Sequence, residues 1–396
     1  MNVPPTASFR PAGAVGDAGE PAGLYVHVPF CSAICPYCDF AVSRARSDDV
    51  ERFVEALLRE VGSWRAPGVT FDTLYLGGGT PSLLAPEALE RLLMSLGRRF
   101  ELAPDALLVL EANPEDVAPA AAAAWRALGV RTLSLGVQSF DDADLRMLGR
   151  RHRRAQALRA VETAVAAGFD VVSVDLIYAL PDRSLAAWRR TLEMVVSLGV
   201  RHLSCYELTV HQGTPYWRWQ QRGGLRLPGE PERAEWFLAT HRALAELGWE
   251  GYEVSNFAAG PRHRSRHNQK YWRHAPYLGL GPSAHSFDGA RRWWNRRGFA
   301  DWAGALASGE PAVAGEEHLD RGALALEMLL LGLRTSDGVD LERYRSVAGE
   351  DLLLARGDEV ERLADAGLIG VGHGWLRPTL EGMAVAESLA LRLSGP

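Results

Sequence analysis

The 396-residue sequence is poor in cysteine and in lysine, and both shortages limit what the chain can be. Only four residues are cysteine, and three of these fall within eight residues of one another, a distribution typical of a metal site. A framework of paired cysteines, as in small secreted domains, is therefore excluded. Lys270 is the single lysine among 43 basic residues. The other basic residues are arginines, which indicates a coding bias rather than recruitment of anion ligands.

Long apolar runs and an excess of positive charge are also absent. No run of 18 or more apolar residues occurs, so the sequence predicts no transmembrane helix. The formal net charge is −6, and no global basic field favours nucleic acid as a partner. Residues 1–22 are rich in Pro, Ala and Gly and lack the apolar core of a signal peptide. They predict a disordered tail on a cytoplasmic protein.

The three clustered cysteines come directly after an alternating apolar run that is typical of a strand. Cys31, Cys35 and Cys38 have C-x-x-x-C-x-x-C spacing. Thiolates are soft ligands, which select zinc, copper(I) or iron–sulfur clusters. Three thiolates can hold three irons of a [4Fe–4S] cluster and leave the fourth iron open to another ligand. The alternative is a zinc loop, which would need His27 or Asp39 as its fourth ligand.

Six apolar segments alternate with helical segments over the first two thirds of the chain. This alternation predicts a parallel sheet with right-handed crossovers, and the nearly continuous apolar strands predict that both faces are covered. Six units are too few for a closed eight-stranded barrel, so the predicted fold is α/β, an open three-quarter barrel. Ligands of such folds bind at the carboxyl ends of the strands. The predicted strands lie within residues 24–28, 73–82, 107–114, 132–140, 171–181 and 202–210.

The sequence pattern changes after the predicted barrel, which spans residues 23–250. Residues 251–310 contain Gly-punctuated apolar stretches and predict an extension at the barrel edge. Residues 311–396 are mostly helical with one short hairpin, which predicts a small winged-helix-like domain. This domain has no basic stripe, so a packing or lid role is favoured over DNA binding. A regulatory module that combines this domain with a zinc loop is the alternative from another class.

Polar residues follow several predicted strands, where a ligand of a parallel α/β fold would bind. Gly77–Ser82 reads GGGTPS, which lets the backbone approach a ligand but lacks the G-K-[ST] ending of a phosphate loop. Glu111 follows the next strand and can accept hydrogen bonds from ribose hydroxyls or an amine. Gln138, Arg150 and Asp175 occupy similar positions. Taken singly, each residue is more typical of a structural or surface polar role, but their joint placement after apolar strands predicts a binding site.

The order of these motifs resembles the radical S-adenosylmethionine (SAM) superfamily and, within it, the family of oxygen-independent coproporphyrinogen III oxidase and its relatives. The shared motifs, from Leu24 to at least Phe287, are YVHVPFCSAICPYCDF, GGGTPS, EANP, GVQSF, LGRRH and DLIYALP. The resemblance implies that the three clustered cysteines bind a [4Fe–4S] cluster whose open iron is chelated by SAM. It places Tyr25, Tyr37, Gly78, Gly79, Thr80 and Glu111 against that SAM. Gln138, Arg150 and Asp175 match positions that contact a second SAM in the oxidase.

The segment HNQKYW is similar to the HNxxYW motif of the heme chaperones in this family, the HemW type. The resemblance implies heme as a ligand, because histidine can bind heme iron and aromatic rings can pack on a porphyrin. The motif residues assigned to heme are His267, Asn268, Tyr271 and Trp272. Candidate partners for the heme propionates are Arg262, Arg264, Arg266 and Arg273, and alternative iron ligands are His263 and His274.

The resemblance therefore implies a heme chaperone that passes heme to an acceptor protein such as a respiratory enzyme, with transient membrane contact. Two departures from the oxidase favour this interpretation. The oxidase has a further cysteine two residues after the third one, where this sequence has Phe40, and its N-terminal arm is longer. The alternative is the oxidase itself, which decarboxylates coproporphyrinogen III oxidatively to protoporphyrinogen IX. Whether SAM is cleaved, and so whether the protein is an enzyme, stays open.

Overall fold

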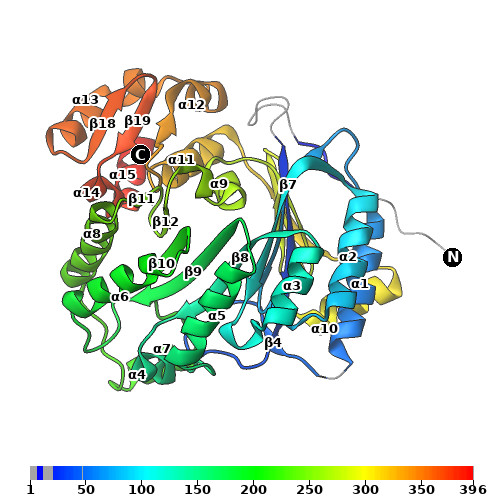
Figure 1. Cartoon of the computed structure of the whole chain (residues 1–396). Helices are drawn as coiled ribbons and strands as arrows, with labels where there is room; N and C mark the ends of the chain where they lie inside the picture. The colour runs from blue at the N-terminus through cyan, green and yellow to red at the C-terminus, as the bar shows by residue number, and fades with distance from the viewer. Residues whose placement is uncertain (1–6, 12–20, 47, 396) are drawn as a thin grey trace.

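The computed structural model describes residues 7–11, 21–46 and 48–395, and a mixed sheet of twelve strands is its central feature (Figure 1). Seven neighbouring strands of this sheet are parallel, and the first six, in the order β10-β9-β8-β7-β6-β2, are the predicted ones; β13 (Tyr277–Leu280) is the seventh. The first six confirm the predicted six-unit partial barrel. Their bounds are β2 (Ala22–Val28), β6 (Thr70–Gly78), β7 (Glu101–Ala112), β8 (Val130–Gln138), β9 (Val171–Tyr178) and β10 (His202–Glu207).

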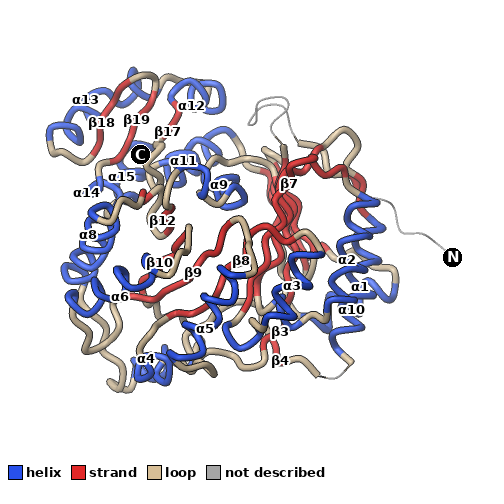
Figure 2. The backbone as a smooth tube through the Cα atoms, in the orientation of Figure 1, coloured by secondary structure: helices blue, strands red, loops and turns tan. Residues whose placement is uncertain are grey.

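Helices connect these strands and cover the outer side of the sheet (Figure 2). Helix α1 illustrates the reason, because Phe53, Val54 and Leu57 lie on one face and are fully buried against the sheet. None of the described helices is both long and apolar enough to cross a lipid bilayer. The helix bounds are α1 (Asp49–Ser63), α2 (Pro86–Arg99), α3 (Pro119–Ala127), α4 (Asp142–Met147), α5 (Arg154–Ala166), α6 (Leu185–Ser197), α7 (Pro215–Gln221) and α8 (Glu230–Glu246).

Six further strands extend the sheet at its two edges. Two of them lie beside β10, and four lie beyond β2, so the sheet continues past residue 310, where the sequence predicts a domain boundary. These strands are two to six residues long, too short for apolar alternation to reveal them. Their bounds are β11 (Glu250–Gly251), β12 (Asn256–Ala258), β13 (Tyr277–Leu280), β14 (His285–Phe287), β15 (Arg291–Asn295) and β16 (Val313–His318). Helices α9 (Arg266–Trp272) and α10 (Phe299–Ser308) lie between them in the chain.

The C-terminal part packs helices around a three-stranded sheet, in agreement with the predicted helical, winged-helix-like domain. It has its own apolar core, in which Leu329, Leu376 and Leu389 are almost completely buried. Phe287 of β14 belongs to the same core and joins it to the barrel edge. The elements are α11 (Arg321–Gly332), β17 (Val339–Asp340), α12 (Leu341–Ala348), α13 (Leu352–Asp365), β18 (Ile369–Gly372), β19 (Trp375–Pro378), α14 (Leu380–Met383) and α15 (Ala386–Ser394).

The prediction of a disordered tail over residues 1–22 is wrong at residues 7–9. Ala7–Ser8 form strand β1, which pairs with β5 (Trp64–Arg65), and Phe9 is fully buried. Its ring lies 5.9 Å from that of Phe71 and 6.1 Å from that of Trp293. Burying one such side chain contributes about 1.5–3 kcal/mol, which composition alone does not reveal. Most of the remaining tail lies outside the described residues.

Candidate functional site

The carboxyl ends of the parallel strands surround a cavity of about 410 Å³ beside the cysteine loop, named here the barrel mouth. It collects the three clustered cysteines and eight of the nine residues that the sequence assigns to SAM. Tyr25 is the ninth, and it lies deeper in the barrel, where its hydroxyl group is 3.1 Å from His27 Nδ1. The assigned residues that line the mouth are Cys31, Cys35, Tyr37, Cys38, Gly78, Gly79, Thr80, Glu111, Gln138, Arg150 and Asp175.

The cysteine loop is closed at its base and stiffened at its tip. At the base, β3 (Phe30–Cys31) pairs with β4 (Ser43–Arg44). At the tip, the Cys38 amide donates to the Cys35 carbonyl oxygen over 3.1 Å. All three thiols are partly exposed to the mouth. The loop therefore presents three soft ligands to one cavity, as an iron–sulfur cluster requires.

Two side chains from loops outside the cysteine loop donate hydrogen bonds to the thiols. Thr80 Oγ1 lies 3.5 Å from Cys31 Sγ, and Arg150 Nη1 lies 3.4 Å from Cys35 Sγ. Asn113 joins these donors, since its Nδ2 donates to Thr80 Oγ1 over 2.9 Å and its Oδ1 accepts from Arg150 Nη2 over 2.5 Å. Such contacts to ligand sulfurs orient them and tune a bound cluster. Sequence reasoning missed Asn113, although it follows Glu111 in the EANP motif.

The pKa values of two cysteine thiols are raised, so these thiols need a positive metal centre to become thiolates. Burial raises the pKa of the Cys31 thiol, and burial together with the neighbouring thiols raises that of Cys38 to about 11. Metal ligation needs the thiolate, so a positive metal centre must supply the compensating charge. Within the described residues, no three His, Cys, Asp or Glu side chains converge closely enough to share one ion. The thiols instead line one wall of the mouth.

The glycine-rich turn after β6 packs against the cysteine loop. Gly78 has φ +104°, and a side-chain Cβ there would lie 2.5 Å from the His27 ring. At Gly79 a Cβ would lie 2.5 Å from the Phe30 carbonyl oxygen, and the Gly79 amide donates to the Val28 carbonyl oxygen over 2.7 Å. These glycines are therefore required by close approach within the chain itself, as well as by any ligand in the mouth.

Two partly buried carboxyl groups lie under the mouth. Glu111 accepts hydrogen bonds from Tyr75 Oη over 2.7 Å and from the Gly78 amide over 3.0 Å. Ser134 Oγ donates to Asp175 over 3.2 Å. Burial raises the pKa of Glu111 to about 7 and that of Asp175 to about 6. Both groups can accept hydrogen bonds from hydroxyl or ammonium groups of a ligand near neutral pH.

A second cavity of about 450 Å³, the barrel interior, continues from the mouth toward the opposite end of the strands. It shares Glu111 and Asp175 with the mouth, and His267 and Asn268 line it. The His267 side chain is almost fully buried: its Nδ1 lies 2.8 Å from Thr73 Oγ1 and its Nε2 lies 2.9 Å from Tyr271 Oη. Burial lowers the pKa of His267 to about 3, with the nearby Lys270 ammonium adding to the effect. The imidazole is therefore neutral.

The structure divides the HNQKYW motif between two cavities. Trp272 lies on the other side of α9 from His267 and lines a third cavity of about 650 Å³ between α9 and the C-terminal domain. Arg262, Arg264 and Arg266 line the barrel interior, whereas Arg273 lines the third cavity. Several of these arginines already have carboxylate partners: Arg264 pairs with Glu250 and Asp337, Arg266 with Asp105, and Arg273 with Asp337.

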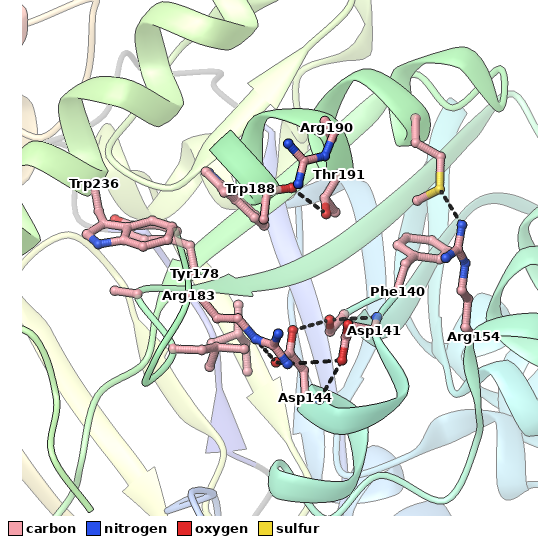
Figure 3. A pocket seen from close by; sticks show the side chains of 16 residues that line it. Phe140, Asp141, Asp144, Arg154, Tyr178, Arg183, Trp188, Arg190, Thr191 and Trp236 are labelled. Atoms are coloured by element: carbon pink, nitrogen blue, oxygen red, sulfur yellow. Dashed lines mark hydrogen bonds and ion pairs between the residues drawn. The ribbon is translucent and has the colours of Figure 1, made fainter. Parts of the chain in front are cut away.

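A fourth cavity, of about 440 Å³, lies beside the loop that follows β9 (Figure 3). Tyr178 packs there against two tryptophans. Its ring centroid lies 5.8 Å from that of Trp188 and 6.5 Å from that of Trp236. Arg183 anchors the loop by donating to Asp144 over 2.5 Å and to Asp141 over 3.0 Å. None of the residues that the sequence assigns to a ligand lines this cavity.

Comparisons with known proteins agree with the geometry of the mouth. Residues 25–195 match the radical SAM superfamily, and residues 319–385 match the HemN C-terminal domain. The E. coli coproporphyrinogen III oxidase HemN, a solved radical SAM enzyme, has the same fold, with a TM-score of 0.79 and 22% identity. That comparison covers 95% of this chain and 90% of the oxidase chain.

Three curated relatives match most of their length. Heme chaperone HemW of Synechocystis sp. is 35% identical, and the alignment covers 83% of this chain and 81% of that protein. Heme chaperone HemW of Mycobacterium tuberculosis is 38% identical, and the alignment covers 86% of this chain and 91% of that protein. The mitochondrial radical SAM domain-containing protein 1 of Bos taurus is 33% identical over 97% of this chain and 91% of that protein. Similarity of this extent confirms the family that the motifs predict. The chain belongs to the HemW family of radical SAM proteins, whose superfamily membership implies a [4Fe–4S] cluster and SAM.

Proposed function

We propose that this protein is a heme chaperone that binds heme and passes it to an acceptor protein, on a scaffold that carries a [4Fe–4S] cluster and SAM. The observation that carries the proposal is the similarity, along more than four fifths of each chain, to relatives named heme chaperones. A cavity between α9 and the C-terminal domain, next to the HNQKYW motif, is consistent with a large flat ligand. The proposed acceptor is a respiratory enzyme.

In this proposal the three clustered cysteines hold the cluster, and the other residues of the mouth hold SAM. When bound, the cluster supplies an open iron for SAM and an electron. Thr80 and Arg150 orient the thiolates through their hydrogen bonds to sulfur. Glu111 and Asp175 accept hydrogen bonds from the ligand, and Gln138 lies at the same rim. Gln138 has φ 68°, a strained conformation of the kind found at binding sites.

Replacing Glu111 by glutamine tests the SAM site. We expect SAM to bind about tenfold to a hundredfold more weakly to cluster-loaded protein, because a charge-assisted hydrogen bond is lost and the amide can mispair with the Gly78 amide. The Glu111 pKa is about 7, so SAM affinity of the unsubstituted protein should rise as the pH increases from 6 to 8. The variant should lose that pH dependence in equilibrium dialysis. Glu55→Gln, at an exposed position, is the control and should bind SAM like the unsubstituted protein. If Glu111→Gln also binds SAM with unchanged affinity, Glu111 is not part of the SAM site.

Anaerobic titration of cluster-reconstituted protein with heme, followed at the Soret band, tests the proposed function. We expect saturation at about one heme per chain, in the low-micromolar range or tighter. Loaded protein should then transfer heme to an apo form of a respiratory b-type cytochrome at a rate that depends on acceptor concentration. Binding that does not saturate, combined with turnover of coproporphyrinogen III, would support the oxidase alternative instead.

The assignment of His267, Asn268, Tyr271 and Trp272 to heme stays a prediction. The structure sets a condition on it, because both ring nitrogens of His267 already have hydrogen-bond partners. Iron binding by His267 would require the ring to give up Thr73 or Tyr271. The His267→Ala variant is therefore included in the heme titration, and a weakened Soret response would support His267 as the ligand.

A further inference from the structure

We propose that heme occupies the interdomain groove, the cavity of about 650 Å³ between α9 and the C-terminal domain, with Trp272 and Trp375 as its walls. The inference rests on the proposed function and deepens it by naming the heme site. The groove is larger than the barrel mouth and the barrel interior, and it lies where two parts of the fold meet. Small-molecule sites occur preferentially at such junctions and have volumes of about 300–1,000 Å³.

The groove has a mixed polar and apolar lining, and its apolar side chains suit a porphyrin. Trp272 comes from α9 and Trp375 from β19, and both side chains are only partly buried. Met328 of α11 and Val339 of β17 add apolar surface between them. Partly exposed aromatic rings that line a cavity offer apolar area that a ligand can bury, at about 25 cal/mol per Å². A flat aromatic macrocycle would cover more of this area than a compact polar ligand.

The groove also contains two side chains that can bind iron, His274 and Met328. His274 Nε2 lies 2.8 Å from Glu327 Oε2, while its Nδ1 is buried without a hydrogen-bond partner. Arg292 donates to both oxygens of Glu327, over 2.9 and 2.6 Å. Burial opposes ionisation of Glu327, but the hydrogen bonds from His274 and Arg292 dominate and lower its pKa to about 2. Such a carboxylate fixes the tautomer of a histidine and increases its strength as a metal ligand.

Cationic groups near the groove suit the two propionates of heme. Arg273 and Arg343 line it, and guanidinium groups bind carboxylates in a bidentate geometry. Arg273 pairs with Asp337 and Arg343 donates to the His274 carbonyl oxygen over 3.2 Å, so a propionate would share these guanidinium groups with their present partners. The acidic groups in the lining already have partners: Asp337 pairs with Arg273 and Arg264, and Asp340 accepts hydrogen bonds from backbone amides at the start of α12. The lining is therefore not a repulsive environment for an anionic ligand.

The barrel interior is the alternative heme site, and it differs from the groove in the histidine that the HNQKYW motif presents to it. Glu111 and Asp175, partly buried in its lining, would repel propionates when ionised, whereas Arg262, Arg264 and Arg266 in the same lining would attract them. His267 has both ring nitrogens engaged, so no lone pair is free for iron. In this inference the HNQKYW motif contacts heme through Trp272, whereas His267 attaches α9 to the barrel.

The test compares three tryptophan variants in the heme titration of cluster-reconstituted full-length protein. We expect Trp272→Ala and Trp375→Ala each to weaken heme binding about tenfold. Trp219→Ala is the matched control, because Trp219 is an exposed tryptophan on α7 outside the groove, and it should bind like the unsubstituted protein. Protoporphyrin IX without iron should show the same order of affinities. Saturable binding that all three variants retain would overturn the groove site while leaving the proposed function intact.

Two further measurements keep the inference testable if a tryptophan variant folds poorly. His274→Ala or Met328→Leu should shift the Soret maximum of bound heme, whereas the control Trp219→Ala should leave it in place. Amide hydrogen exchange of the unsubstituted protein should show heme-dependent protection of residues 332–340 and 375–378. Protection confined to residues 262–268, with a Soret shift only in His267→Ala, would place heme in the barrel interior and contradict the inference. Absence of saturable binding to the unsubstituted protein would instead contradict the proposed function.

Discussion

Cys35→Ala protein should emerge from anaerobic reconstitution with almost none of the iron and sulfide that the unsubstituted protein takes up. A [4Fe–4S] cluster held by three thiolates has no spare protein ligand, so loss of one thiolate removes about a third of the protein's hold on it. Arg150 would also lose the sulfur to which it donates. We expect iron to fall from about four per chain to well below one, measured together with acid-labile sulfide and visible absorbance.

Cys205 provides a matched control for this experiment. It is the remaining cysteine, almost fully buried on β10 and part of the apolar core. Cys205→Ala should therefore keep its full iron content, with only a small loss of stability from the smaller side chain. One zinc per chain without sulfide in the unsubstituted protein would contradict the cluster proposal and revive the zinc-loop alternative.

Lys270→Met should lower the free energy of unfolding by about 3 kcal/mol, because it leaves a buried carboxylate without its cation. Lys270 Nζ lies 2.7 Å from Asp72 Oδ1 and donates to the Pro21 carbonyl oxygen over 2.6 Å. The Lys270 side chain is 5% exposed and that of Asp72 is 12% exposed, so water can replace the lost partner only in part. Arg266 Nη1, at 3.7 Å from Asp72, compensates only in part. Denaturant unfolding followed by circular dichroism measures the change.

The double variant Lys270→Met, Asp72→Asn shows whether the loss of stability comes from the unpaired charge or from altered packing. Removing both charges takes away the penalty of an unpaired buried carboxylate, so the double variant should recover a large part of the lost stability. If Lys270→Met alone costs less than about 0.5 kcal/mol, the ion pair contributes no more than an exposed one would. The single lysine of the chain would then have no structural role at this position.

The core of the fold and the barrel mouth were predictable because their signals are local in the sequence. Each parallel strand is an apolar run that ends in polar or glycine residues, and parallel strands place those ends at one edge. Eight of the nine predicted SAM residues consequently line the mouth together. Tyr25 is the exception, since it lies in the middle of β2, and its side chain stays inside the barrel.

The edges of the sheet and the position of the N-terminal segment were not predictable in the same way. Strands β11 to β16 are short, and within the described sheet they join the barrel strands only through β12 and β13, which pair with the distant strands β10 and β2. Phe9 is held in place by Phe71 and Trp293, which are 62 and 284 positions further along the chain. Contacts of this kind leave no periodic pattern in the residues that make them.

The sequence by itself determined the cysteine spacing, the alternation of strands and helices and the presence of an HNxxYW motif, because each is a property of neighbouring residues. Only the tertiary structure decided which way each motif residue faces. In α9, His267, Lys270 and Tyr271 lie at i, i+3 and i+4 and face the barrel, as the helical repeat requires. Gln269, Trp272 and Arg273 repeat the same spacing on the opposite side and line the interdomain groove. Both faces are encoded in the same seven residues, 267–273, and the packing of α9 between the barrel and the C-terminal domain assigns each face its partner.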